Sequence, residues 1–226
     1  LLAPRRHFRQ RQVSAPTHSL SMTIRSLAIA AFVASSLSAV LAGQPTAGNL
    51  SNPAPTPIYR EHAFDIETGM LWQVGNYTDI DYRLVPTQFA WRSPRWFGLD
   101  LDNGASISVR HRAALLGTWV ENGPESHYFG FMFSPSIEYW NKAQTWSVYA
   151  GAGGGFGWID SQGVEGGQGQ DFTLNWFGHL GLQQVISDRL TLRVGTMFQH
   201  MSNGGATSPN PGIDAVGFTV GASWKF

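Results

Sequence analysis

The chain of 226 residues contains no cysteine. This absence excludes a disulfide framework and any metal site built on thiolates. It does not argue against export from the cytoplasm, because a closed β-barrel is held together by the hydrogen bonds between its own strands. Cofactor motifs are lacking as well. The glycine-rich stretch 151–157 has no Lys-Ser/Thr of a phosphate-binding loop, and the stretch 100–104 lacks the downstream Glu of a calcium loop. We therefore expect neither a metal nor a cofactor.

Long apolar runs are scarce. The apolar stretch Leu27 to Leu41 is short for a membrane-spanning helix, and polar, proline-rich sequence follows it. Arg25 precedes the stretch, and Val40-Leu41-Ala42 has the small residues of a signal-peptidase site. These features predict a cleaved secretory signal peptide over residues 22–42.

The predicted signal peptide divides the chain. Residues 1–21 are basic and irregular, and we interpret them as an upstream segment that forms no structure. Residues 43–57 are rich in Pro, Ala and Asn and have no periodicity, which indicates a periplasmic lead-in. The remaining residues, 58–226, are expected to form one folded domain.

Basic residues are few beyond the predicted signal peptide. Five of the 15 Lys and Arg residues lie before residue 43, whereas all 15 acidic residues follow it. The remainder of the chain therefore carries a net charge of about −5. No basic patch survives that would attract nucleic acid, so we do not expect nucleic acid as a partner.

The chain has instead a recurring alternation of apolar or aromatic side chains with glycine or polar ones. It runs through residues 62–75, 82–91, 105–119, 127–140, 144–158, 171–186, 189–202 and 214–226. Alternation with period two places the apolar set on one face of a strand, and an apolar outer face is typical of a membrane-spanning barrel. Eight strands make a barrel that side chains fill, which is a plug rather than a pore. The sequence therefore predicts an all-β, eight-stranded, antiparallel up-and-down transmembrane β-barrel.

The chain's last strand and its loop lengths predict location and orientation. An amphipathic final strand ending in Phe226 resembles the C-terminal signal of bacterial outer-membrane proteins. Short turns at 141–143 and 187–188 alternate with longer connections, as expected if the turns are periplasmic and the longer loops face outward. The connection 92–104 is an exception, because it should be a periplasmic turn and is long. With both termini in the periplasm, residues 200–202 lie at the outer end of their strand, beside the lipopolysaccharide leaflet.

Three polar residues interrupt the apolar face at this outer end. His200 and Ser202 are two positions apart, so they share the strand face that carries Phe198. Asp214 begins the neighbouring strand with matching face parity and can pair with the imidazole across the strands. Serine needs a base to accept its proton, and the base needs a third group to orient it. The pattern predicts ester hydrolysis of a lipid substrate, with His200 as base, Ser202 as nucleophile and Asp214 as orienting acid.

The loop between these strands contains hydrogen-bond donors for an oxyanion. Asn203, Gly205 and Asn210 lie within a few residues of the predicted nucleophile. Backbone N–H groups and side-chain amides are the donors that stabilise a tetrahedral oxyanion in acyl transfer. We therefore interpret these three residues as a candidate oxyanion and substrate-binding site.

The segment from Gln199 to Asp214 resembles the lipid A 3-O-deacylases of the PagL family. It reads His-x-Ser-Asn-Gly-Gly, then Asn-Pro-Gly, then an acid twelve residues after the serine. Elsewhere the resemblance rests on barrel pattern and length. It implies an outer-membrane barrel that uses a metal-free His-Ser-Glu triad to hydrolyse the ester-linked acyl chain at position 3 of lipid A in lipopolysaccharide. This chain departs from the family in carrying Asp214 where the family has Glu, which is one methylene longer.

Two other classes of function stay open on the sequence alone. One is a non-enzymatic outer-membrane barrel, structural or adhesive, whose loop 159–170 binds a partner. The other is a different outer-membrane lipid enzyme, either a phospholipase or a palmitoyltransferase. A homodimer is compatible with the sequence, although no residue predicts it. His179 falls on the inward face of its strand, and we interpret it as a structural residue of the interior.

Overall fold

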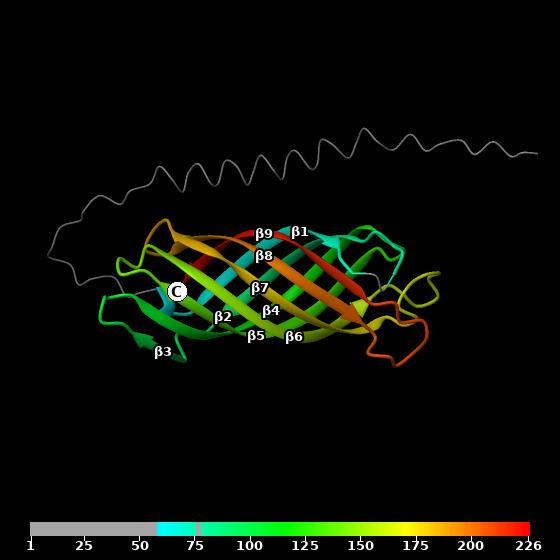
Figure 1. The fold of residues 1–226 in the computed structure, drawn as a ribbon, viewed down its shortest axis with the longest axis horizontal. Helices are drawn as coiled ribbons and strands as arrows, with labels where there is room; N and C mark the ends of the chain where they lie inside the picture. The colour runs from blue at the N-terminus through cyan, green and yellow to red at the C-terminus, as the bar shows by residue number, and fades with distance from the viewer. Residues whose placement is uncertain (1–57, 76–77) are drawn as a thin grey trace, which may run out of the picture. The chain divides into compact units, whose positions relative to one another are not determined.

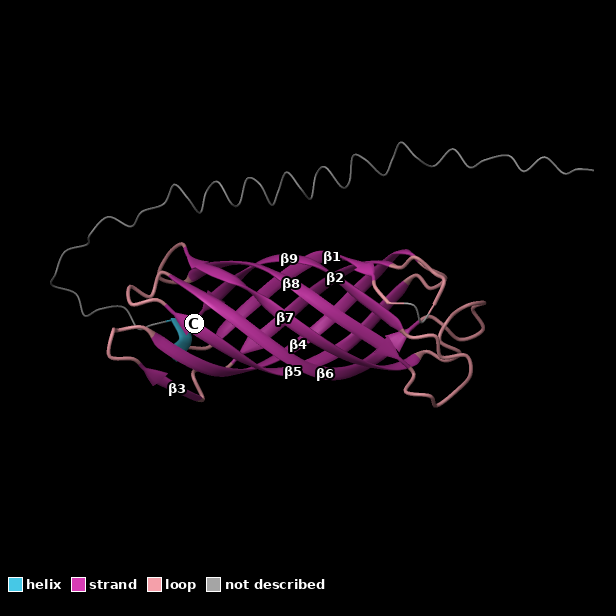
Figure 2. Ribbon diagram, in the orientation of Figure 1, coloured by secondary structure: helices cyan, strands magenta, loops and turns pink. Residues whose placement is uncertain are grey.

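The alternating segments form β-strands. A computed structural model describes residues 58–75 and 78–226, so the predictions for residues 1–57 lie outside the described residues. The elements are η1 (Ile58–Arg60), β1 (Ala63–Gln73), β2 (Arg83–Arg92), β3 (Phe97–Asp100), β4 (Ser106–Asn122), β5 (His127–Trp140), β6 (Trp146–Ile159), β7 (Phe172–Val185), β8 (Leu190–Ser202) and β9 (Ile213–Lys225). Figure 2 shows that strands dominate the described part of the chain. Within that part, no helix has the length and apolar character needed to cross a membrane.

Eight of the strands close into a barrel. Each pairs antiparallel with its neighbours in the order β2-β1-β9-β8-β7-β6-β5-β4, and β2 pairs with β4 to close the ring. The strands are inclined to the long axis of the barrel, as Figure 1 shows. The first strand, β1, pairs with the last, β9, and all other neighbours in the barrel wall are consecutive among the eight barrel strands. The predicted eight-stranded up-and-down barrel is therefore confirmed.

The long connection after β2 contains a strand that the alternation did not predict. β3 pairs with the first residues of β4, beyond the point where β2 ends. The Ser93 and Trp96 N–H groups, 2.9 Å from their acceptors, continue the backbone hydrogen bonds to β4 across the break. Pro94, between them, has no N–H to donate, which interrupts the pairing. Because β4 is 17 residues long, it offers an edge that this connection covers. The connection is thus long because it extends the sheet.

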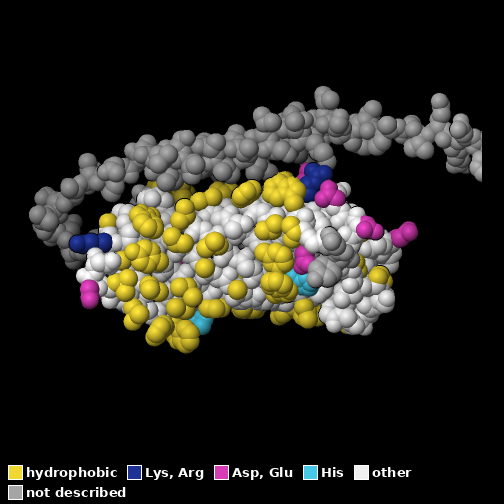
Figure 3. Space-filling view, viewed as in Figure 1, with side chains coloured by type: hydrophobic (Ala, Val, Ile, Leu, Met, Phe, Trp, Pro, Cys, Tyr) yellow, Lys and Arg dark blue, Asp and Glu magenta, His cyan; other side chains and the backbone are white. Residues whose placement is uncertain are grey.

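Apolar side chains cover the outer surface of the barrel. The burial pattern along the strands alternates between buried and exposed residues, and the exposed set is aromatic and aliphatic. Figure 3 shows these side chains distributed over the length of the barrel wall, whereas most of the visible acidic side chains lie toward one end. An apolar outer wall fits a barrel surrounded by lipid.

The barrel interior is filled with charged side chains. The fully or nearly fully buried charged residues inside the wall are Asp65, Glu67, Arg92, Arg110, Arg112, Glu138 and Arg193. Arg92 contacts both Asp65, at 2.9 Å, and Glu138, at 2.5 Å. Arg193 forms an ion pair with Glu67. Burial of a charge is costly unless the charge is paired, and these pairs compensate for that cost. The interior is consequently a plug, as predicted.

The two ends of the barrel differ. The described connecting residues 74–75, 78–82, 123–126, 160–171 and 203–212 lie at one end, and the turns 141–145 and 186–189 lie at the other. The C-terminus is at the end with the turns, as Figure 1 shows. The end of β8 and the start of β9, which carry the predicted catalytic residues, are therefore at the loop end, opposite the C-terminus.

Candidate active site

The pairing of β8 with β9 brings the three predicted catalytic residues together. His200 and Asp214 are direct cross-strand partners. His200 Nδ1 lies 2.6 Å from Asp214 Oδ1, and His200 Nε2 lies 2.9 Å from Ser202 Oγ. Side chains directly opposite each other on an antiparallel pair are the closest across the strands. The shorter acid therefore reaches the imidazole because of its register.

All three side chains belong to the outer face of the barrel. The flanking residues Gln199 and Met201 are fully buried in the interior, and His200 between them is partly exposed. The His200 side chain is 25% exposed and the Asp214 side chain is 12% exposed. Asp214 thus points outward but is nearly covered. A substrate would meet Ser202 and His200 before it met the carboxylate.

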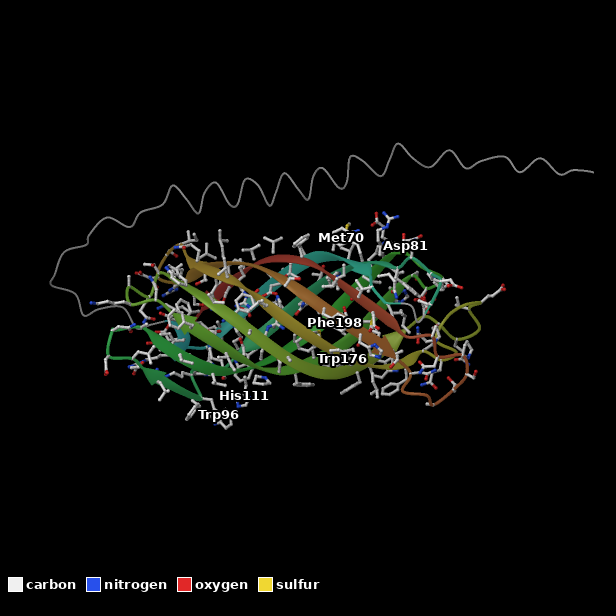
Figure 4. The ribbon with its side chains drawn as sticks, in the orientation of Figure 1. Met70, Asp81, Trp96, His111, Trp176 and Phe198 are labelled. Atoms are coloured by element: carbon white, nitrogen blue, oxygen red, sulfur yellow. The ribbon has the colours of Figure 1, made fainter. Side chains whose placement is uncertain are left out.

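Aromatic side chains lie on one side of the imidazole. Trp176 of β7 stacks on His200 with ring centroids 5.7 Å apart and an interplanar angle of 29°. Phe198 packs on the same indole at 4.8 Å. Figure 4 shows Trp176 and Phe198 side by side on the barrel wall. On β9, Val216 is the cross-strand partner of Phe198 and is 36% exposed. The polar triad is therefore set in an apolar surface.

The hydrogen-bond partners define which tautomer of His200 fits this arrangement. An ionised carboxylate only accepts hydrogen bonds, so Asp214 requires a proton on His200 Nδ1. Nε2 is then the unprotonated nitrogen that accepts from the Ser202 hydroxyl. This arrangement is the one in which imidazole acts as a general base on serine. Among the described residues, no group of three or more His, Cys, Asp and Glu side chains is placed to hold a metal ion.

The predicted oxyanion donors are partly engaged within their own loop. The Asn203 N–H donates to Asn210 Oδ1 at 2.9 Å, and the Gly205 N–H donates to Asn203 Oδ1 at 2.8 Å. Asn210 is exposed, and its Nδ2 has no hydrogen-bond partner in the described residues. Hydrogen bonds within the loop therefore hold it together, and the Asn210 side-chain amide is left as a donor that an oxyanion could use. The oxyanion role of these three residues stays a prediction.

Two other histidines on the strands, His111 and His179, have structural surroundings. His179 is buried in the interior, where its Nε2 lies 3.2 Å from Tyr149 Oη and 3.1 Å from Thr219 Oγ1. The structural interpretation of His179 is therefore confirmed. His111 lies on the outer face of β4 and packs against Trp96 at 4.6 Å, near the end with the turns (Figure 4). Neither histidine has a hydrogen bond or ring contact with His200, Ser202 or Asp214.

Sequence reasoning missed two contributors to the site. Trp176 is the cross-strand partner of His200 on β7, a relation that only the β7–β8 register reveals. Gly212 has a positive φ of 71°, and a Cβ built on it would lie 3.6 Å from His200 Cε1. The Asn-Pro-Gly sequence was a usable signal for Gly212, since glycine is favoured at positive φ. That sequence did not predict that Gly212 would lie close to His200.

Solved structures that resemble the chain share little sequence with it. The crystal structure of the outer membrane enzyme PagL is 17% identical, covers 70% of this chain and 97% of its own, and gives a TM-score of 0.48. Neisserial surface protein A is 11% identical, covers 73% of this chain and 97% of its own, and gives a TM-score of 0.48. The outer membrane protein OprG from Pseudomonas aeruginosa is 8% identical, covers 74% of this chain and 96% of its own, and gives a TM-score of 0.35. No curated protein matches the chain.

A family model settles what the chain is related to. The model described as lipid A 3-O-deacylase (PagL) matches residues 76–223. This range is more than half of the 226 residues and includes His200, Ser202 and Asp214. The chain therefore belongs to the PagL family of lipid A 3-O-deacylases and is a β-barrel of the bacterial outer membrane.

Proposed function

We propose that this chain hydrolyses the ester that links an acyl chain to position 3 of lipid A. Ser202 is the nucleophile, His200 the general base and Asp214 the orienting acid. The observation that carries the proposal is the unbroken hydrogen-bonded series Asp214–His200–Ser202, at 2.6 and 2.9 Å, in a member of this family.

The chemistry follows from this series. Ser202 Oγ attacks the ester carbonyl while His200 Nε2 accepts the hydroxyl proton, and the Asp214 carboxylate stabilises the imidazolium that forms. Collapse of the tetrahedral intermediate breaks the bond to the sugar oxygen, which takes the proton from Nε2. Water, activated by the same imidazole, then releases the acyl group from Ser202 as a free 3-hydroxy fatty acid.

The surroundings of the series suit a substrate that is half lipid and half sugar. Trp176 stacks on His200 and is 52% exposed, so its aromatic surface would contact acyl chains. The loop 203–212 lies immediately beyond Ser202 and is mostly exposed and polar. An ester at position 3 joins an acyl chain to a sugar, so it has to react at such a boundary. In this proposal the site faces the outer leaflet, where lipid A resides.

A direct test uses purified barrel in mixed micelles with lipid A and follows released 3-hydroxy fatty acid. Ser202→Ala and His200→Asn each abolish release, because one lacks the nucleophile and the other lacks the base. Thr196→Ala is the matched control, since it removes a hydroxyl from the same face of the same strand. It should retain wild-type release.

Folding must be checked in every variant. A folded barrel changes its electrophoretic mobility on heating, and this shift reports the closed fold independently of activity. Release by folded Ser202→Ala at the wild-type rate would refute the proposed nucleophile. Loss of release in Thr196→Ala as well would show that the assay responds to general damage of this face.

A further inference from the structure

Gln168 is fully buried although it lies in an outer loop, between β6 and β7. Polar side chains in loops are usually exposed, and burial of an amide is costly without hydrogen bonds. The Gln168 N–H donates to Ser161 Oγ, and its carbonyl oxygen accepts from Asn203 Nδ2 at 2.5 Å. Its side-chain Oε1 accepts from the Gly212 N–H at 3.3 Å. One residue of the β6–β7 loop therefore contacts the first and last residues of the β8–β9 loop.

Both contacted residues adjoin the catalytic series. Asn203 directly follows Ser202, and Gly212 precedes by two residues Asp214, which contacts the imidazole. A Cβ added to Gly212 would lie 3.6 Å from His200 Cε1. The Asn203 side chain also donates to the Thr207 carbonyl at 3.0 Å, so it organises the loop internally. Movement of either residue would shift the nucleophile or the base.

Gln168 is in turn held by the remaining outer loops. Ser161 Oγ, which accepts from Gln168, donates to Glu125 Oε1 at 2.9 Å. Tyr82 donates to the other oxygen, Glu125 Oε2, at 2.8 Å. Burial, together with the neighbouring Glu125 carboxylate, raises the pKa of Tyr82, so the phenol remains a donor. A buried series of hydrogen bonds thus runs from the β1–β2 loop through the β4–β5 and β6–β7 loops to the active-site loop.

We propose that Gln168 is a positioning residue for ester hydrolysis, which fixes the segment 203–212 relative to His200 and Ser202. This inference rests on the proposed function. Gln168 does not touch the triad and, being fully buried, does not touch a substrate at the outer surface. It acts through Asn203 and Gly212. Small displacements of a catalytic group reduce turnover strongly, so a buried contact of this kind affects the rate of the chemical step.

The test compares two glutamines of the same loop. Gln168→Met has nearly the same volume but replaces the amide acceptor for the Gly212 N–H with a weakly accepting thioether sulfur. Gln170→Met removes a similar loop hydrogen bond, from Gln170 Nε2 to the Phe172 carbonyl at 2.8 Å, which does not involve the active-site loop. We expect kcat on lipid A to fall roughly tenfold in Gln168→Met, because a buried N–H loses its amide acceptor. KM should stay within about twofold, and Gln170→Met should match the wild type.

Gln168→Asn is a milder second variant if Gln168→Met does not fold. It keeps the backbone hydrogen bonds and the polarity but is one methylene short of Gly212, so kcat should again fall. Wild-type kcat in the folded Gln168 variants would overturn the inference, as would an equal loss in Gln170→Met or a change confined to KM. If the wild-type barrel itself releases no fatty acid, the proposed function fails instead, and the two failures are thereby distinguished.

Discussion

At the residue scale, the acid of the triad is the position where this chain departs from the family resemblance. Aspartate is one methylene shorter than glutamate, yet its carboxylate lies 2.6 Å from His200 Nδ1. The contact forms because Asp214 is the direct cross-strand partner of His200. Strand register therefore replaces side-chain length in bringing the acid to the base.

Asp214→Asn tests the orienting role. The amide no longer carries the charge that holds the Nδ1–H tautomer and stabilises the imidazolium. We expect release of fatty acid to fall by about 10²–10⁴-fold, less completely than in Ser202→Ala, because proton transfer itself uses Nε2. Single-turnover kinetics on lipid A measures the loss. Unchanged turnover in Asp214→Asn would mean that another group is the third member.

Gly212→Ala tests the backbone beside the imidazole. Gly212 has a φ of 71°, where a side chain is strained, and the added Cβ would contact His200. We expect a destabilisation of about 1 kcal/mol and a lower turnover. Gly163→Ala is the matched control, because Gly163 has a φ of 77° and open space around its Cβ position. Equal turnover in the two variants would contradict the role of the His200 contact.

The proximity of His200, Ser202 and Asp214 could be predicted from the sequence, but the contacts of this site with the other loops could not. His200, Ser202 and Asp214 follow from the period-two alternation and the order of two adjacent strands. Gln168 lies in a loop 35 residues before Asn203, and no local pattern relates the two. Such pairs depend on how separate loops pack at the end of the barrel.

At the element scale, the glycines of β6 permit close approach of β5. A Cβ on Gly155 would overlap the carbonyl oxygen of Phe131 on β5, and one on Gly153 would overlap that of Phe133. The glycine-rich stretch, which lacks the features of a phosphate-binding loop, is thus a requirement of strand packing.

Gly155→Ala is accordingly expected to impair folding of the barrel. The new Cβ would meet the Phe131 backbone of β5, which cannot move away without breaking the β5–β6 pairing. Gly178→Ala in β7 is the control, since nothing lies within 4 Å of its Cβ position. The folded fraction after refolding into detergent, read from the heat-dependent gel shift, should fall only for Gly155→Ala. Full refolding of Gly155→Ala would contradict the packing argument.

The eight barrel strands could be predicted because each repeats its alternation over about ten residues or more. β3 could not, because four residues after Pro94 contain too few repeats to distinguish a strand from a loop. Its formation depends on the extra length of β4, which supplies the partner. The length of the connection 92–104, where a short turn was expected, was the sign in the sequence that something other than a turn lies there.

At the scale of the whole molecule, an outer-membrane barrel reverses the usual arrangement of polar and apolar residues. The wall is apolar outside, and the interior contains paired charges from strands far apart in the sequence. The period-two alternation of each strand predicts which charged residues point inward. It does not predict how they pair, because the partners lie on strands that meet only across the closed barrel. Glu67 of β1, for example, pairs with Arg193 of β8.

Glu67→Ala tests the contribution of this network. It leaves Arg193 fully buried without the carboxylate that it contacts, and it removes the partner 3.5 Å from His179. We expect the free energy of unfolding to fall by about 3–5 kcal/mol. Glu121→Ala is the control, because its ion pair with Arg83 is long, at 3.9 Å, and partly exposed, and its loss should cost less than about 1 kcal/mol. Denaturant unfolding in lipid vesicles compares them, and equal losses would contradict the network's role.

The central claim is that the barrel removes one acyl chain from lipid A by means of Ser202. Mass spectrometry of lipid A from cells that make the wild-type protein, beside cells that make Ser202→Ala, tests it most directly. The account predicts loss of one 3-hydroxyacyl mass with the wild type and intact lipid A with the variant. Intact lipid A in both, with folded barrel in the outer membrane, would contradict the claim and favour a non-enzymatic barrel or a phospholipase, and a gain of mass would indicate an acyltransferase.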